Sequence, residues 1–168
     1  MAKRQVFFSF HYKNDVRRAA QIRSIGQLEG EKPVSDNEWE EVRNKTDESI
    51  KRWIDNNMLY RSCLVVLVGT ETYSRKWVKY EIEHAWKKGM GVLGIYIHNI
   101  KDPIYGTCQK GKNPFEEFSF GNVNFSSIVK CYNPNSIDAY NDIKNNISSW
   151  VEEAITIRNR YVRVKSNW

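Results

Sequence analysis

Residues 63–68 are Cys-Leu-Val-Val-Leu-Val, an uninterrupted apolar run that Gly69 closes. A strand with one face in water alternates apolar and polar side chains, whereas a strand buried on both faces does not alternate. Residues 92–97, Val-Leu-Gly-Ile-Tyr-Ile, have the same character. Both runs are therefore predicted to be parallel strands in the interior of an α/β sheet.

Helices are predicted between these strands, because apolar side chains recur there at helical spacing. The clearest case follows Thr46, a good N-cap residue with Asp47 and Glu48 in the first turn behind it. The predicted order is a strand at 6–10, a helix over 16–25, the helix after Thr46, the strand 63–68, a helix over 75–88, the strand 92–97, a strand within 127–132 and a long helix that Asn135 or Ser136 caps.

This alternation predicts an α/β fold, a central parallel sheet with helices on both faces joined by right-handed crossovers. In such sheets the ligand crevice lies beyond the carboxyl ends of the strands. Three connections are placed to line it: residues 11–15, residues 69–74 and the acidic stretch around Asp36.

The composition is that of one soluble globular domain, with 168 residues, of which 40% are hydrophobic and 27% charged. We expect a single domain over residues 1–157, with an insertion near 99–125, and a basic tail over 158–168. The net charge is +6, but four of the basic residues fall in that tail, so no specific nucleic-acid binding is expected. They are Arg158, Arg160, Arg163 and Lys165.

The cellular setting is predicted to be the cytoplasm. Three cysteines cannot form a closed set of disulfides. Residues 1–10 do not have the pattern of a signal peptide, and no apolar run approaches the ~20 residues of a membrane span. No membrane partner is expected.

Several familiar functional motifs are incomplete or absent. Residues 106–112 have the glycine and lysine spacing of a phosphate-binding P-loop, but Asn113 stands where Ser or Thr should hold magnesium, and Pro114 follows. The three histidines are too dispersed to predict a metal site. No Gly-x-Ser-x-Gly nucleophile elbow is present.

The helix predicted over residues 75–88 carries an unusual carboxylate. At about 100° per residue, counted from Trp77, Glu81 lies at ~40°, inside a sector that also contains Ala85 and Val78 at ~80° and ~100°. Glu83 lies at ~240° and faces water. A carboxylate beside a Trp on the shoulder of a buried face is costly without a function or a partner. The alternative is a structural ion pair of Glu81 with Lys88 or Arg75.

Two stretches resemble Toll/interleukin-1 receptor (TIR) domains. Residues 6–12, Val-Phe-Phe-Ser-Phe-His-Tyr, resemble their opening strand and loop. Residues 66–82 resemble their third strand and the following helix, where a Trp-Cys-x-x-Glu motif carries the catalytic glutamate; here Val78 replaces the Cys. Both stretches are more similar still to the TIR-like ThsB proteins of the bacterial Thoeris antiphage system, and the resemblance covers residues 4–100.

The resemblance implies an enzyme. Catalytic TIR domains cleave the nicotinamide–ribose bond of NAD⁺, as glycohydrolases or ADP-ribosyl cyclases. ThsB proteins use this chemistry, when phage infect, to make an ADP-ribose-derived messenger that diffuses to a separate effector. NAD⁺ is then the substrate, and neither a cofactor nor a metal is implied. The departing nicotinamide leaves an oxocarbenium-like ribose that a fixed carboxylate stabilises.

The resemblance also assigns residues. Glu81 matches the catalytic glutamate, and Trp77 matches a wall beside the ribose. Phe10 and His11 match the loop where bases or phosphates approach. Asp36 falls in the loop that resembles the family's BB loop, with Trp39 close by. The alternative for Phe10 and Trp39 is core packing, and for His11 and Asp36 it is a solvated loop.

A second class of function stays open, a catalytically silent TIR-type module that works by TIR–TIR self-association. Glu81 at the matching position favours the enzyme. A nucleotide-binding flavodoxin-like regulator is a more distant alternative.

Overall fold

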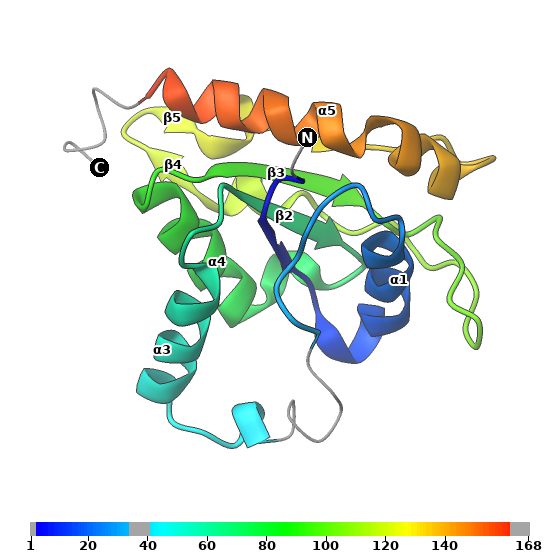
Figure 1. Cartoon of the computed structure of the whole chain (residues 1–168), viewed down its shortest axis with the longest axis horizontal. Helices are drawn as coiled ribbons and strands as arrows, with labels where there is room; N and C mark the ends of the chain where they lie inside the picture. Colours follow the sequence, from blue (N-terminus) through cyan, green and yellow to red (C-terminus); the bar gives the residue numbers. More distant parts are fainter. Residues whose placement is uncertain (1–2, 34–40, 162–168) are drawn as a thin grey trace.

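The computed structural model describes residues 3–33 and 41–161, so Asp36 and Trp39 lie outside the described residues. A four-stranded parallel sheet with the order β1-β2-β3-β6 forms the centre (Figure 1). Its strands are β1 (Val6–Ser9), β2 (Cys63–Val68), β3 (Gly91–Tyr96) and β6 (Cys131–Tyr132). The main helices are α1 (Tyr12–Ser24), α3 (Asp47–Met58), α4 (Lys76–Lys87) and α5 (Ala139–Asn159).

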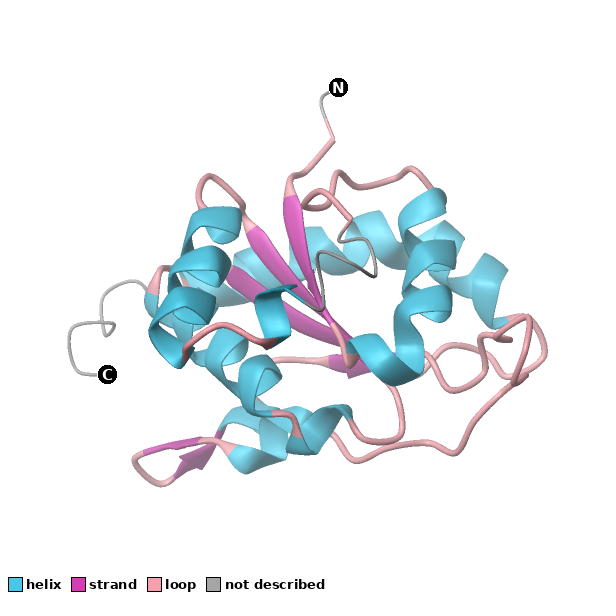
Figure 2. Ribbon diagram, turned by 90° about the horizontal axis from the view of Figure 1, so that it is seen from below, coloured by secondary structure: helices cyan, strands magenta, loops and turns pink. Residues whose placement is uncertain are grey.

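The run that predicted the fold is strand β2, and every one of its residues is buried. Alternate side chains enter two separate cores. Leu64 and Val66 belong to the core that α3 and α4 cover, whereas Cys63 and Val65 belong to the core that α1 and α5 cover. Figure 2 shows the strands between these helical layers. The predicted α/β fold, a parallel sheet with helices on both faces, is confirmed.

The helix boundaries follow their capping residues. Thr46 caps α3 as predicted, because its hydroxyl accepts a hydrogen bond from the Ser49 N–H at 3.3 Å. The prediction for α5 is wrong by a few residues, since Asp138 is the N-cap. Asn135 instead accepts the N–H of Ile137 in the preceding turn, so it is not available to cap the helix.

The predicted surface insertion near residues 99–125 is partly core. It contains a 3-10 turn (Pro114–Glu117) and a small hairpin of β4 (Ser119–Phe120) and β5 (Val123–Asn124). Phe115 and Phe125 have no exposed surface, and Phe125 packs edge-on against Trp86 with 4.9 Å between ring centroids. These two aromatic anchors fix the insertion to the α4 side of the sheet. The strand expected within 127–132 is reduced to the two residues of β6, and Ser127, the first residue of the expected range, ends a 3-10 turn instead.

Arg158 corrects the predicted tail. It was expected to begin a solvated basic terminus, but it lies in the last turn of α5 and is 1% exposed. Its Nε and Nη2 donate to the carbonyl of Trp86 at 3.1 and 2.9 Å, and its guanidinium lies 4.6 Å from the centroid of the Trp86 ring. Arg158 therefore joins the carboxyl end of α5 to that of α4, and the charge pattern of the tail concealed this.

None of the helices within the described ranges is both long and apolar enough to cross a membrane.

Candidate active site

Glu81 lies on the inner face of α4, one turn after Trp77, and is 8% exposed. Ser9, the last residue of β1, donates its hydroxyl to Glu81 Oε1 at 2.7 Å. Within residues 3–33 and 41–161 no ion pair joins Glu81 to Arg75 or Lys88, which was the structural alternative. The helix thus presents Glu81 at the carboxyl end of β1, the edge of the sheet where a ligand crevice is expected.

The environment of Glu81 favours its neutral form. Burial raises the pKa of Glu81 from 4.5 to about 8, the Ser9 hydrogen bond opposes this, and the nearby charge of Glu31 adds to it. A carboxyl group with such a pKa is mostly protonated at neutral pH, and a cation brought beside it would favour the carboxylate. Such perturbed groups gather at functional sites.

Glu83, two residues further along α4, provides the internal contrast. Its side chain is 53% exposed and forms an ion pair with Lys87 at 2.7 Å, an ordinary i,i+4 pair on a helix surface. The helical spacing alone predicted this difference between the two carboxylates, and the prediction is confirmed.

A second buried carboxylate, Glu31, was not predicted. It is 3% exposed, accepts the N–H of Phe8 at 3.0 Å, and pairs with Arg23 at 2.7 Å. Because β1 is the edge of the sheet, its outward N–H groups need acceptors. The carbonyl of Glu29 serves Val6 at 2.8 Å, and the side chain of Glu31 serves Phe8. The sequence around Glu31, with Gly30 before it and Pro33 after it, carries no pattern that predicts a side chain serving as acceptor for a strand N–H.

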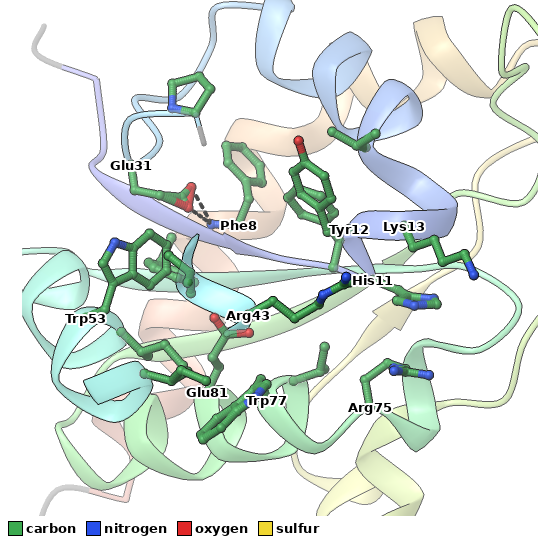
Figure 3. A pocket seen from close by; sticks show the side chains of 18 of the residues that line it. Phe8, His11, Tyr12, Lys13, Glu31, Arg43, Trp53, Arg75, Trp77 and Glu81 are labelled. Atoms are coloured by element: carbon green, nitrogen blue, oxygen red, sulfur yellow. Dashed lines mark hydrogen bonds between the residues drawn. The ribbon is translucent and has the colours of Figure 1, made fainter. Parts of the chain in front are cut away.

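A cavity of about 470 Å³ opens at this edge of the sheet. Phe10, His11, Trp77 and Glu81, four of the predicted site residues, line it. Figure 3 shows the Glu81 carboxylate directed into the cavity, with Arg43 beside it and Trp77 next to it. The volume lies in the range of small-molecule sites. The structure therefore brings together every predicted site residue that it describes.

One end of the cavity is cationic. Lys13, His11 and Arg75 lie together there, away from Trp53 at the other end (Figure 3). His11 has its pKa lowered by burial first and then by the positive charge of Arg75, so it is neutral at pH 7. Its Nδ1 is buried and lacks a hydrogen-bond partner within the described part of the chain, although Glu71 Oε2 lies 3.8 Å away. This end is suited to an anionic group that can also accept a hydrogen bond.

Charge is therefore found in two regions of the cavity. The buried carboxyl group of Glu81 lies among aromatic walls with Arg43 beside it, and Lys13 and Arg75 lie at the end away from Trp53. Across the described ranges, no three His, Cys, Asp or Glu side chains lie close enough to hold a metal ion. The arrangement can stabilise a developing positive charge beside Glu81 while it holds an anionic part of the same molecule at the cationic end.

Comparisons with known proteins agree with this geometry. Residues 7–102 match the family model described as Thoeris protein ThsB, TIR-like domain. The chain is also similar to a protein of Bacillus cereus (strain MSX-D12) named "Putative cyclic ADP-D-ribose synthase ThsB1". The two are 35% identical over 127 residues, which cover 71% of this chain and 65% of the relative, so the chain spans less than two thirds of that relative's length. The matched family segment holds β1 except for its first residue, all of α4 and all four cavity residues named above. By its sequence, its parallel sheet and the site at the end of β1, the chain belongs to the ThsB family of TIR-like domains.

Proposed function

We propose that this protein cleaves the nicotinamide–ribose bond of NAD⁺ and converts the ADP-ribose part into a nucleotide signal. The observation that carries the proposal is the buried carboxyl group of Glu81 at the end of β1, directed into a cavity with a cationic end. The similarity to the relative named "Putative cyclic ADP-D-ribose synthase ThsB1" supports the choice of substrate.

The chemistry needs little from the protein beyond one fixed charge. When the bond between ribose C1′ and the pyridinium nitrogen breaks, its electron pair leaves with neutral nicotinamide, and C1′ becomes oxocarbenium-like. The Glu81 carboxylate stabilises that cation in a largely dry site, where a single charge has a large effect. Capture of C1′ by water gives ADP-ribose and a proton, whereas capture by a nitrogen of the adenine closes a ring.

The substrate itself favours the working form of Glu81. The pyridinium of NAD⁺ is positive, and a positive charge nearby lowers the pKa of a carboxyl group. Binding therefore opposes the burial that holds the pKa of Glu81 near 8 in the free protein. In this proposal the diphosphate of NAD⁺ is the anionic part that Lys13 and Arg75 hold.

The wider role in this proposal is antiphage defence, in which a cyclic ADP-ribose-type messenger diffuses to a separate effector. The family membership supports this role. The role implies that the protein has little NAD⁺-cleaving activity until infection. Self-association of the domain is compatible with the same activity.

The experiment is to incubate the protein with NAD⁺, with and without lysate of phage-infected cells, and to identify the products by mass spectrometry. We expect nicotinamide and an ADP-ribose derivative in equal amounts. Glu81→Gln should lower nicotinamide release by about 10²–10³-fold, and the surface control Glu83→Gln should retain it. No nicotinamide release by the wild type in either condition would reject the proposal in favour of a non-catalytic module, and equal release by the wild type and Glu81→Gln would reject Glu81 as the catalytic residue.

A further inference from the structure

The cavity continues around the edge strand of the sheet. Neighbouring side chains of β1 point to opposite faces, so Phe7 packs into the core under α3 and α4, whereas Phe8 packs into the core under α1 and α5. Both nevertheless line the cavity. The cavity therefore has a lobe on each face, and in Figure 3 Phe8 and Tyr12 lie on one side of the β1 ribbon while Glu81 and Trp77 lie on the other.

The lobe on the α1 side is walled by a second stripe of that helix. Tyr12, Val16 and Ala20 follow one another at intervals of four residues and all line the cavity. They are distinct from the core-facing positions Ala19 and Ile22, which are 1% and 2% exposed. Val16 is half-buried and Ala20 is exposed. An apolar helix stripe that faces a cavity and not the core is a suitable wall for a flat, apolar ligand group.

The two lobes differ in charge. The lobe on the α3 side contains Glu81, which makes no ion pair within the described residues, and Arg43 lies beside it. In the lobe on the α1 side, the guanidinium of Arg23 lies 5.0 Å from the centroid of the Phe8 ring and neutralises Glu31 at 2.7 Å. A positively charged ring can pair with the Glu81 carboxylate in the first lobe, whereas the carboxylate of the second lobe already has a cation as its partner. A neutral ring that stacks on an aromatic side chain suits the second.

We propose that the lobe on the α1 side binds the adenine when the substrate first binds, with Tyr12, Val16 and Ala20 as its wall, while the nicotinamide ribose lies beside Glu81. A turnover that closes a ring then requires the base to leave this lobe and reach C1′ after nicotinamide departs. This assignment rests on the proposed function. Two apolar lobes with a cationic end at Lys13 and Arg75, where neutral His11 also lies, match a molecule in which two rings are joined by a diphosphate. The ligand class of the α1-side lobe is thus a purine nucleotide.

The test is equilibrium binding of the two halves of the substrate, AMP and nicotinamide mononucleotide, by isothermal titration calorimetry. Ala20→Trp fills the lobe from an exposed position on α1 and displaces no core side chain. Ser24→Trp is the matched control, since Ser24 is exposed on the same helix but does not line the cavity. Tyr12→Leu is a second variant that removes the ring and keeps an apolar side chain.

We expect Ala20→Trp to weaken AMP binding at least about tenfold and nicotinamide mononucleotide binding less than twofold, with both unchanged in Ser24→Trp. Because stacking of a base on an aromatic side chain is worth about fivefold or more in affinity, Tyr12→Leu should weaken AMP binding by at least that factor. If AMP does not bind the wild type, if Ala20→Trp leaves its affinity unchanged, or if nicotinamide mononucleotide is lost instead, the assignment is wrong. The titrations measure binding without turnover. Absence of nicotinamide release would therefore reject the proposed function, whereas the assignment of the adenine lobe is judged from the AMP affinities alone.

Discussion

Replacement of the buried carboxyl group should make the stability of the protein less dependent on pH while it removes activity. In the folded chain the pKa of Glu81 is about 8, against 4.5 for the exposed side chain, so the folded state binds this proton more tightly than the unfolded state does. The stability of the wild type therefore falls as the pH rises from 4.5 to about 8. Glu81→Gln keeps the shape and can accept the Ser9 hydrogen bond, but it has no proton to lose.

The magnitude follows from the two pKa values. Each pH unit between them corresponds to about 1.4 kcal/mol, so the variant gains about 3 kcal/mol relative to the wild type between pH 5.5 and 8.5. Whatever its amide contributes is the same at both pH values and cancels from this difference. Against a total stability of about 5–15 kcal/mol for a domain, this gain is easily measured.

Urea unfolding of both proteins at pH 5.5, 7 and 8.5 gives the difference directly. Glu83→Gln is the control, because its surface pair with Lys87 is worth no more than about 0.5 kcal/mol and its effect should vary little over this range. A stability difference between Glu81→Gln and wild type that stays constant from pH 5.5 to 8.5 would refute the buried, proton-binding Glu81 described above.

Three more outcomes are expected. We expect kcat/KM for nicotinamide release to rise with pH, and the midpoint of that rise should lie at a higher pH in Ser9→Ala than in the wild type. The hydrogen bond from Ser9 favours the Glu81 carboxylate, so its loss raises the pKa of Glu81; an unchanged midpoint would contradict this. Arg158→Ala should lower the free energy of unfolding by about 2 kcal/mol, since the Trp86 carbonyl loses two hydrogen bonds from a buried guanidinium and keeps the one from the Gly89 N–H; a melting temperature equal to that of the wild type would contradict it. A chain that ends at Tyr161 keeps Arg158 and should retain wild-type nicotinamide release and stability; loss of activity in this truncation would show that the tail is needed.

Local patterns predicted the parts of the fold that depend on local physics. The unbroken apolar run at 63–68 can only be satisfied by burial on both faces, so it predicted the interior parallel strand with its correct ends. The helical period placed Glu81 on the buried side of α4 and Glu83 on the wet side before any partner was known. The N-cap of α3 at Thr46 could also be predicted, since a cap depends only on the residue itself and the next three residues.

The site required more than periodicity. The resemblance to TIR domains supplied Phe10, His11 and Trp77, and the structure places all three around the same cavity. Asp36 lies outside the described residues and stays a prediction. Glu31 was missed because its partners, the N–H of Phe8 and the guanidinium of Arg23, are brought to it only when the chain crosses the edge of the sheet.

What the sequence determined by itself is the class of fold, the order of its elements and the side of α4 that carries a buried carboxyl group, because each depends on residues within a few turns of one another. Only the tertiary structure decided what that carboxyl group meets. Ser9 lies 72 residues from Glu81, and the pKa of about 8 arises from burial by distant segments. Arg158 makes the same point in reverse, since its charge predicted a solvated tail and its packing on Trp86 made it core. Desolvation and pairing depend on which distant groups exclude water, and the folded chain alone brings those groups together.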